Sequence, residues 1–139
     1  MSDLEQNKAV ARRFFELLSA ADADALMSMY ADTFSCWTAG RLPFSGTHPR
    51  DEVKAMIQGV TAVFPSGWRF TVRTLTAEDD RVAAEAECSG THVSGKRYEQ
   101  RYHFLFRIRD GKIYELREYF DTMHANDVLC STPAPGFSS

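Results

Sequence analysis

One acidic side chain, Glu118, lies in a segment whose other inward-facing residues are apolar. Residues 112–121 alternate between two faces, and the more apolar face carries Tyr114, Leu116, Glu118 and Phe120. We expect this face to be buried, and burial among apolar groups raises the pKa of a carboxyl group. Carboxyl groups of this kind often serve as general acids or bases. In two alternatives, the carboxyl is tied to a hydroxyl of the core, or it lies near enough to the end of the sheet to reach water.

The neighbouring segment supplies a hydroxyl that could meet this carboxyl. Residues 98–109 also alternate, and the face with Gln100, Tyr102 and Phe104 should point to the same side as Glu118. Tyr102 is therefore a candidate hydrogen-bond partner and a second candidate catalytic residue. In the structural alternative, its hydroxyl only satisfies its own hydrogen bonding inside the core.

Small residues face inward from the preceding segment, residues 81–92, and include Ala84, Ala86 and Cys88. Small side chains beneath a layer of helices leave space, and space beside a carboxyl and aromatic rings is typical of a small-molecule pocket. Large helical side chains could fill that space instead. The residues that we expect to contact a substrate are Phe14, Tyr30, Cys88, His92, Phe104, Tyr114 and Phe120, with His92 at the rim.

The histidines and cysteines do not indicate a metal site. His48, His92, His103 and His124 include no pair with ligand spacing, and the three cysteines share no short spacing. We therefore expect no metal, no other cofactor, and reduced thiols. The sequence lacks the GxSxG, GxGxxG and phosphate-loop motifs, which argues against ordinary serine hydrolases, dinucleotide enzymes and nucleotide hydrolases.

Three helices are expected before the first long strand. Apolar residues recur at helical spacing over residues 4–20, and Asp22 can cap a second helix that runs to Tyr30. A short strand over residues 34–38 and a turn-rich loop follow. Helical spacing then returns over residues 51–64.

After these helices, the spacing of apolar residues changes from helical to alternating. Four alternating runs joined by short turns predict an antiparallel meander over residues 68–76, 81–92, 98–109 and 112–121. This order of elements predicts an α+β fold. The helices should cover one face of the sheet, and the other face should meet water or a second subunit.

Length and composition fit one globular domain. The chain has 139 residues, of which 44% are hydrophobic and 25% charged. We expect a domain over residues 1–130 and a flexible tail over residues 131–139. The net charge of −3 and the scattered basic residues argue against nucleic-acid binding. No apolar run reaches the length of a membrane span and no signal peptide is evident, so we expect a cytoplasmic protein without a membrane partner.

Four segments resemble the NTF2-like superfamily, in particular its SnoaL-like and ketosteroid-isomerase-related branches. They are SAADADALMSMYAD (residues 19–32), GTH (90–92), YHFLFRIRDGKI (102–113) and LREYFDT (116–122), and the resemblance extends over residues 4–129. It implies a cone in which three N-terminal helices pack on a curved, mixed, mostly antiparallel sheet, with a pocket between them. The superfamily contains isomerases, epoxide hydrolases, cyclases, dehydratases and binding proteins, so the resemblance alone does not assign an activity.

Two catalytic sets of the superfamily are incomplete in this chain. By the resemblance, the positions of the aspartate base, the tyrosine and the protonated aspartate of steroid isomerases hold Thr38, Phe14 and Phe104. Epoxide-hydrolase-like members use five polar residues, of which only the final aspartate has an acidic counterpart here, Glu118. Both activities are therefore unexpected.

The resulting hypothesis is a SnoaL-like small-molecule enzyme of the isomerase, cyclase or dehydratase type. Glu118 would act as general acid or base, and Tyr102 would orient an apolar, carbonyl-containing substrate. The alternatives are a non-catalytic module that binds a small apolar ligand, and a dimerisation domain with a filled core. In every case we expect a homodimer through the outer face of the sheet, where Leu105, Ile113 and Tyr119 lie among charged residues.

Overall fold

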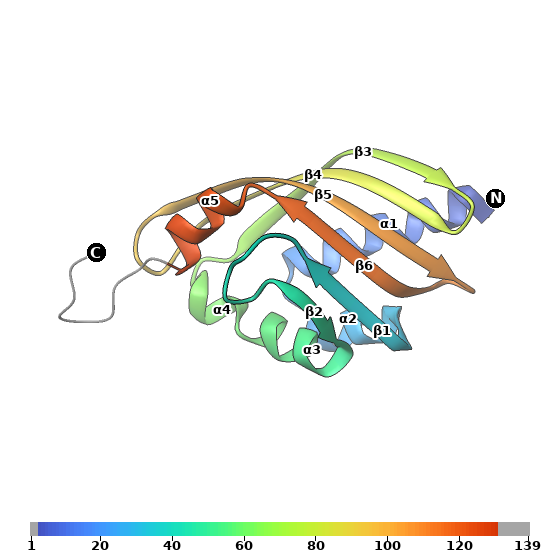
Figure 1. Cartoon of the computed structure of the whole chain (residues 1–139), viewed down its shortest axis with the longest axis horizontal. Coiled ribbons are helices and arrows are strands. Elements are labelled where there is room, and N and C mark those ends of the chain that lie inside the picture. Colours follow the sequence, from blue (N-terminus) through green and yellow to red (C-terminus); the bar gives the residue numbers. More distant parts are fainter. Residues whose placement is uncertain (1–2, 131–139) are drawn as a thin grey trace.

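The structure, a computed structural model, describes residues 3–130 and arranges them as a curved sheet with helices on one of its faces (Figure 1). The predicted tail over residues 131–139 lies outside this range. The elements of the described part are α1 (Asp3–Ser19), α2 (Ala23–Met29), β1 (Tyr30–Thr38), β2 (Gly46–Pro49), α3 (Arg50–Gln58), α4 (Val60–Val63), β3 (Trp68–Glu78), β4 (Arg81–Thr91), β5 (Arg97–Arg109), β6 (Lys112–Phe120), α5 (Thr122–Ala125) and the π-helical turn η1 (Asn126–Cys130).

The strands form one mixed sheet in the order β2-β1-β6-β5-β4-β3. β1 and β6 run parallel, and all other neighbours are antiparallel. The predicted meander, β3 to β6, is confirmed. The short edge strand β2 lies in the stretch that the sequence predicts as a loop. It ends in Pro49, which an edge strand tolerates because one side of its backbone makes no ladder hydrogen bonds.

The first two helices turn their apolar sides toward the sheet. Phe14 and Phe15 of α1 are buried, while the charged residues of this helix stay at the surface. The indole N–H of Trp68, at the start of β3, donates a 2.7 Å hydrogen bond to the backbone oxygen of Leu18. Asp22 caps α2, as predicted, by accepting a hydrogen bond from a backbone N–H of its first turn. None of the helices within residues 3–130 combines the length and apolar character needed to cross a membrane.

The helix predicted over residues 51–64 is two helices, α3 and α4, so four helices rather than three precede β3. The break is at Gly59, whose backbone N–H is shared between the oxygens of Ala55 at 3.2 Å and Met56 at 3.1 Å. Glycine weakens a helix because its backbone loses much conformational freedom on ordering. Buried apolar residues of both helices, Val60 among them, still contribute to the core, so the predicted layers are unchanged.

The predicted inward faces of β4 and β5 are confirmed. Ala84 and Cys88 of β4 are buried, as are Gln100, Phe104 and Phe106 of β5. Their alternation is regular because β4 and β5 pair without interruption over their shared length. The inward faces of these two strands therefore form one side of the hydrophobic core.

The predicted faces of β6 are wrong at its beginning, because a β-bulge interrupts its pairing with β5. Arg107 pairs with Glu115, whereas the next residue, Ile108, pairs with Ile113. Tyr114 is thus an extra residue, and the alternation reverses at this point. Ile113 is fully buried instead of outward-facing, and Tyr114 leaves the inward row that contains Glu118.

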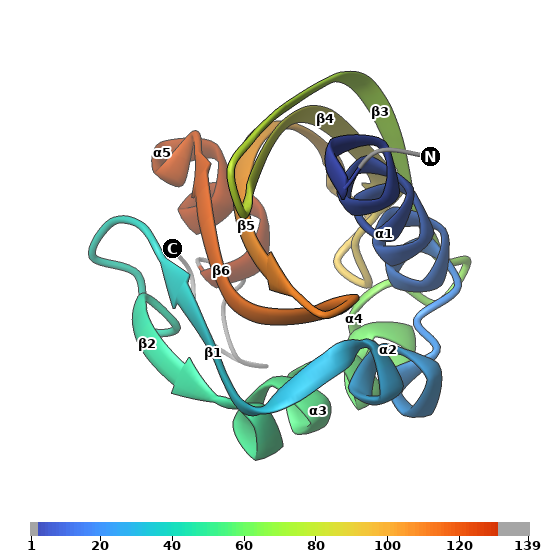
Figure 2. The same cartoon turned by 90° about the vertical axis from the view of Figure 1, so that its right-hand side faces the viewer.

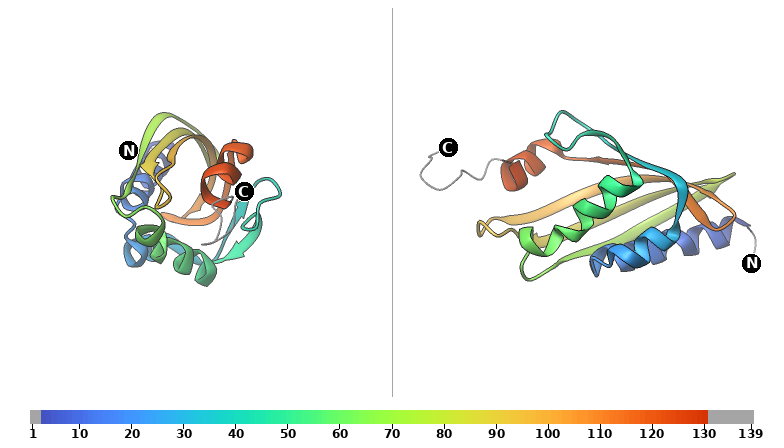
Figure 3. Two further views of the ribbon diagram at one scale, coloured as in Figure 1. Left: turned by 90° about the vertical axis from the view of Figure 1, so that its left-hand side faces the viewer. Right: turned by 90° about the horizontal axis from the view of Figure 1, so that it is seen from below.

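The sheet curls strongly, and the helices close the side toward which it curls. Viewed end-on, β3 and β2 lie on opposite margins of the curve, with α1, α2 and α3 on its concave side (Figure 2). From below, α3 and α4 extend beneath the strands, and α5 follows β6 and lies beside β5 near one end of the sheet (Figure 3). The helices therefore cover the concave face of the sheet.

We predict that Gly90→Ala destabilises the fold. An added Cβ at Gly90 would lie 3.2 Å from the backbone oxygen of Gly67 and 3.3 Å from the Cβ of Trp68, closer than ordinary contact. Forcing an extra methyl into packed surroundings costs about 1–3 kcal/mol. Urea unfolding of both proteins measures the difference. Gly59→Ala is the matched control, because its added Cβ meets only ordinary contacts and should leave stability unchanged or raised.

Candidate functional site

A cavity of about 400 Å³ lies between the concave face of the sheet and the helices α3 and α4. Most of its wall is apolar, with contributions from β1, β3, β5, β6 and the first helix. Glu118 is the one charged side chain among the described residues that line it. A cavity of this size is at the lower end of the range of small-molecule sites.

Glu118 is held by a hydroxyl from the neighbouring parallel strand. β1 and β6 pair so that Thr38 lies directly beside Glu118. The Thr38 hydroxyl donates a 2.8 Å hydrogen bond to Oε1 of the carboxyl, and Thr38 itself is buried. Within residues 3–130 no second hydrogen-bond partner of this carboxyl is found. One oxygen is thus fixed by a core hydroxyl, as one alternative from the sequence proposed, and the carboxyl also borders the cavity.

The surroundings of Glu118 raise its pKa to about 6. The main cause is burial, which penalises the charged form. The hydrogen bond from Thr38 and the more distant His48 favour the charged form and oppose part of this effect. The carboxyl therefore changes its protonation state close to neutral pH, where a group that accepts and returns protons is most effective.

Two further polar side chains of β1, Tyr30 and Cys36, also line the cavity. Burial raises the pKa of both groups well above the ordinary values, and the charge of Glu118 adds to this effect. Both groups consequently keep their protons near neutral pH. The ring of Tyr30 stacks on Phe34 with centroids 3.7 Å apart, which fixes its orientation.

Tyr102 reaches the cavity from β5, but its hydroxyl partner is Tyr98 rather than Glu118. The two tyrosine oxygens are 2.7 Å apart, and the side-chain amide of Gln100 donates to Tyr98 at 3.3 Å. Burial raises the pKa of both tyrosines, so they remain neutral. Among the described residues, the polar side chains of the cavity wall are therefore Tyr30, Cys36, Thr38, Tyr102 and Glu118.

The structure brings five of the nine predicted site residues to this cavity. Two of them, Tyr102 and Glu118, are predicted from the alternation along β5 and β6. The other three carry aromatic rings and belong to α1, β1 and β5. The five residues are Phe14, Tyr30, Tyr102, Phe104 and Glu118.

The other four predicted residues lie outside the cavity wall. His92 is buried behind Phe64, where its Nδ1 contacts the hydroxyl and the backbone N–H of Ser94, and desolvation lowers its pKa. Phe120 packs against the ring of Tyr102 with centroids 5.2 Å apart. The bulge in β6 turns Tyr114 away, and its hydroxyl donates to the carboxylate of Asp80. The fourth residue, Cys88, is buried and is not among the residues that line this cavity.

The space above the small residues of β4 is filled by large side chains of α1, the alternative that the sequence left open. The Phe15 ring lies 6.1 Å from that of Phe70 and 5.0 Å from that of Phe104. The empty volume is displaced toward β1, α3 and α4, where Val53 and Ile57 form part of the wall. In the sequence, the helical spacing of Val53 and Ile57 is the one feature that indicates that they face the core. For Thr38, no local pattern indicates its position beside Glu118.

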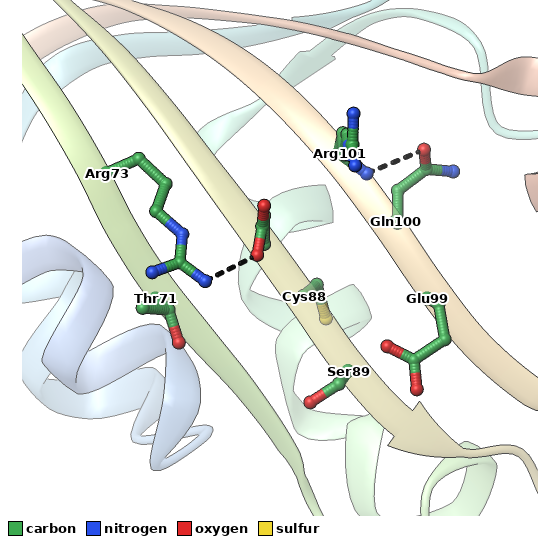
Figure 4. A pocket seen from close by; sticks show the side chains of 8 residues that line it. Thr71, Arg73, Cys88, Ser89, Glu99, Gln100 and Arg101 are labelled. Carbon is green, nitrogen blue, oxygen red and sulfur yellow. Dashed lines mark hydrogen bonds and ion pairs between the residues drawn. The ribbon is translucent and has the colours of Figure 1, made fainter.

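A second, polar hollow of about 320 Å³ lies on the outer face of β3, β4 and β5 (Figure 4). Arg73 pairs with Glu87 across it at 2.8 Å, and the backbone N–H of Arg101 donates to the Gln100 side-chain oxygen. Arg73 and Glu87 are thus paired with each other across neighbouring strands. No cluster of three or more possible metal ligands occurs in the part of the chain that the structure describes.

Comparison with protein families agrees with this architecture. Residues 11–116 match the profile of the SnoaL-like domain. The chain belongs to the SnoaL-like domain family. No curated protein sequence matches it significantly.

Solved structures resemble this SnoaL-like chain over nearly its whole length. Bal32a, from a soil-derived mobile gene cassette, is 22% identical with a TM-score of 0.82 and covers 91% of this chain and 98% of its own. PrhC from Penicillium brasilianum is 17% identical with a TM-score of 0.83, covering 91% and 87%. A protein from Jannaschia sp. CCS1, assigned as a SnoaL-like polyketide cyclase, is 20% identical with a TM-score of 0.76, covering 96% and 98%. These likenesses establish the NTF2-like cone and its mixed, curved sheet as the fold.

We predict that Glu118 makes stability depend on pH in a specific direction. Its pKa in the folded protein, about 6, exceeds the ordinary value of 4.5, so folding favours the protonated form. The free energy of unfolding should fall by about 2 kcal/mol as pH rises from about 4.5 to about 6, and then level off. Glu118→Gln should lack this component and be the more stable protein above pH 6.

Urea unfolding between pH 4 and pH 8 measures this component as the difference between the two proteins. Glu85→Gln, a change on the exposed outer face, is the control and should run parallel to the unaltered protein. A constant difference between Glu118→Gln and the unaltered protein over the whole range would show that Glu118 titrates normally.

Proposed function

We propose that this protein is a small-molecule enzyme in which Glu118 transfers a proton to and from an apolar, carbonyl-containing substrate. The observation that carries the proposal is the carboxyl group with a pKa near 6 at the wall of an otherwise uncharged cavity. At neutral pH this group is mostly ionised, and it can therefore begin as a base. After taking a proton it can return it as an acid.

The reaction type follows from what a single positioned base can do. Glu118 would remove a proton from a carbon next to a carbonyl group, and the C–H electron pair would move toward the carbonyl oxygen to give an enolate. Return of the proton at another carbon is an isomerisation. Attack of the enolate carbon on a second carbonyl closes a ring, and the alkoxide formed takes the proton back from Glu118. Loss of a β-hydroxyl, which leaves as water with that proton, is a dehydration. One positioned acid or base contributes about 10² to 10⁴ in rate, which suits an activated carbonyl compound.

The cavity supports a compact, largely apolar substrate. Rings of Phe14, Tyr30 and Phe104 and the aliphatic side chains of α3 and α4 are part of its wall. Tyr102 supplies a neutral hydroxyl that can orient a substrate oxygen. Membership in the SnoaL-like family, and a neighbour assigned as a polyketide cyclase, agree with a substrate that carries carbonyl groups.

We predict that Glu118→Gln abolishes proton transfer but leaves ligand binding intact. The amide keeps the size and the hydrogen bond from Thr38 but cannot accept a proton at this site. With 2-tetralone and related bicyclic ketones in D₂O, exchange of the α-protons followed by NMR should slow about 10²- to 10⁴-fold toward the uncatalysed rate. In the unaltered protein, the exchange rate should rise with pH and level off above about 6.

The same variant separates the enzyme from the non-catalytic alternative. Equal affinities of both proteins for the ketone, measured by calorimetry, together with lost exchange support the enzyme. Weaker binding by Glu118→Gln, with no exchange in either protein, would identify Glu118 as the anchor of a binding module. Glu85→Gln should match the unaltered protein in both assays.

We further propose a homodimer through the outer face of the sheet. Ile113 cannot take part as expected, because the bulge buries it. Tyr119, 39% exposed, and the half-buried Leu105 remain on that face, and Trp37 packs beside Tyr119 with ring centroids 5.2 Å apart. We predict a dimer mass by light scattering at micromolar concentration and a shift toward monomer in Tyr119→Glu. A monomeric unaltered protein would contradict this proposal.

A further inference from the structure

The hydrogen bonds around Gln100 determine which way its side-chain amide points. The amide is buried, and its Oε1 accepts from the backbone N–H of Arg101 at 3.1 Å (Figure 4). It also accepts from the backbone N–H of Asp121 at 3.1 Å. A flipped amide would place its own N–H groups against these two donors. Nε2 therefore faces its other two neighbours and donates to the backbone oxygen of Asp121 at 2.9 Å and to Tyr98 Oη at 3.3 Å.

This orientation decides the direction of the bond between the two tyrosines. Tyr98 is fully buried, and its oxygen already accepts from Gln100. Within residues 3–130, the remaining hydrogen-bond partner of its hydroxyl is Tyr102 Oη at 2.7 Å. If Tyr102 donated to Tyr98, the proton of Tyr98 would be buried without an acceptor, which is costly. Tyr98 therefore donates to Tyr102.

We propose that the relay of Gln100, Tyr98 and Tyr102 presents the Tyr102 hydroxyl proton to the cavity as a donor for a substrate oxyanion. Tyr102 accepts from Tyr98, so its own proton is free to point toward the cavity that its side chain lines. This inference rests on the proposed function and adds the chemical class of the ligand. The reacting oxygen is one that becomes negative, as a ketone oxygen does on enolisation.

Tyr102 and Glu118 occupy neighbouring positions of adjacent strands. Phe104 pairs with Glu118 across β5 and β6, and Tyr102 pairs with Phe120. Tyr102 and Glu118 are thus diagonal neighbours on the same face, a relation in which the backbone positions of adjacent strands are about 7–8 Å apart. In the proposed arrangement, a carbonyl oxygen binds at Tyr102 and the adjacent carbon lies on the side of Glu118. In the proposed step, Glu118 takes the proton from carbon, the electron pair moves to oxygen, and the Tyr102 hydroxyl stabilises the resulting oxyanion.

In this arrangement Tyr98 and Gln100 are positioning residues. Tyr98 donates to Tyr102, which strengthens the donor ability of the Tyr102 hydroxyl. Gln100 fixes Tyr98 by donating to it and is itself anchored on the backbone of Asp121. Neither residue is among those that line the cavity.

Binding of an oxyanion without turnover tests the relay. The probe is 4-nitrophenolate, and 4-nitroanisole is the matched ligand that lacks the charged oxygen. Both are titrated into Glu118→Gln, since an ionised Glu118 would repel the phenolate. Tyr102→Phe in this background should weaken phenolate binding about 10- to 100-fold, because it removes a hydrogen bond to a charged acceptor. Binding of 4-nitroanisole should change little.

Tyr98→Phe distinguishes the two directions of the tyrosine bond. In the proposed direction, Tyr98→Phe removes a donor to Tyr102 and should weaken phenolate binding about two- to threefold. In the opposite direction it would release the Tyr102 proton and strengthen binding. In the Tyr102→Phe background, the Tyr98 change should have no further effect, because the relay is already broken. Tyr119→Phe, on the outer face, is the control for loss of a tyrosine hydroxyl.

Three results would overturn the relay. These are tighter phenolate binding by Tyr98→Phe, equal effects of Tyr98→Phe with and without Tyr102, and phenolate affinity that does not depend on Tyr102. Circular dichroism and thermal unfolding of each variant ensure that the affinities describe folded protein. Because these titrations use Glu118→Gln, their outcome is independent of whether Glu118 transfers protons.

Discussion

The parallel pairing of β1 with β6 is the constraint on which the candidate site depends. It places the Thr38 hydroxyl beside Glu118, and the 2.8 Å hydrogen bond between them lets a carboxyl remain in an apolar wall. Without that donor, the carboxyl would have no hydrogen bond from the described part of the protein, and its ionisation would cost more. With several such donors its pKa would fall to the ordinary range or below. A single neutral donor leaves the pKa near 6, where both protonation states are accessible.

Aromatic packing decides where the empty volume can be. Phe14 and Phe15 of α1 fill the region above β4 and contact Phe104 and Phe106 edge-on at 5.0–6.0 Å. This cluster anchors α1 on the sheet and leaves no cavity there. The volume beside β1 stays open because α3 and α4 are short and approach the sheet through smaller aliphatic side chains. The filled half of the core thus holds α1 on the sheet, and the other half contains the cavity.

Local patterns in the sequence predict most of the fold and part of the site. Alternation in β5 and β6 places Tyr102 and Glu118 on the inner face, because both positions lie beyond the bulge and follow the regular register. Tyr114 and Ile113 lie at the bulge, where one extra residue exchanges the two faces. No pattern within a single strand reveals that exchange. Thr38 is a similar case, since its pairing with Glu118 depends on a parallel contact between strands 80 residues apart in sequence.

In this NTF2-like fold, the polar groups of the candidate site lie at other positions than the catalytic residues of steroid isomerases. By the resemblance to steroid isomerases, Phe14 and Phe104 occupy positions that carry a tyrosine and an aspartate there. Here their rings lie 6.0 Å apart within the aromatic cluster. The hydroxyl of Tyr102 and the carboxyl of Glu118 come from the adjacent strands β5 and β6. Tyr102 is hydrogen-bonded to Tyr98, and Glu118 is hydrogen-bonded to Thr38. Groups fixed on paired strands keep their separation better than groups on loops, so a ligand that spans them meets a preorganised donor and base. The relative position of the two residues is therefore fixed by the register of β5 against β6, and it differs from the positions that the steroid isomerases use.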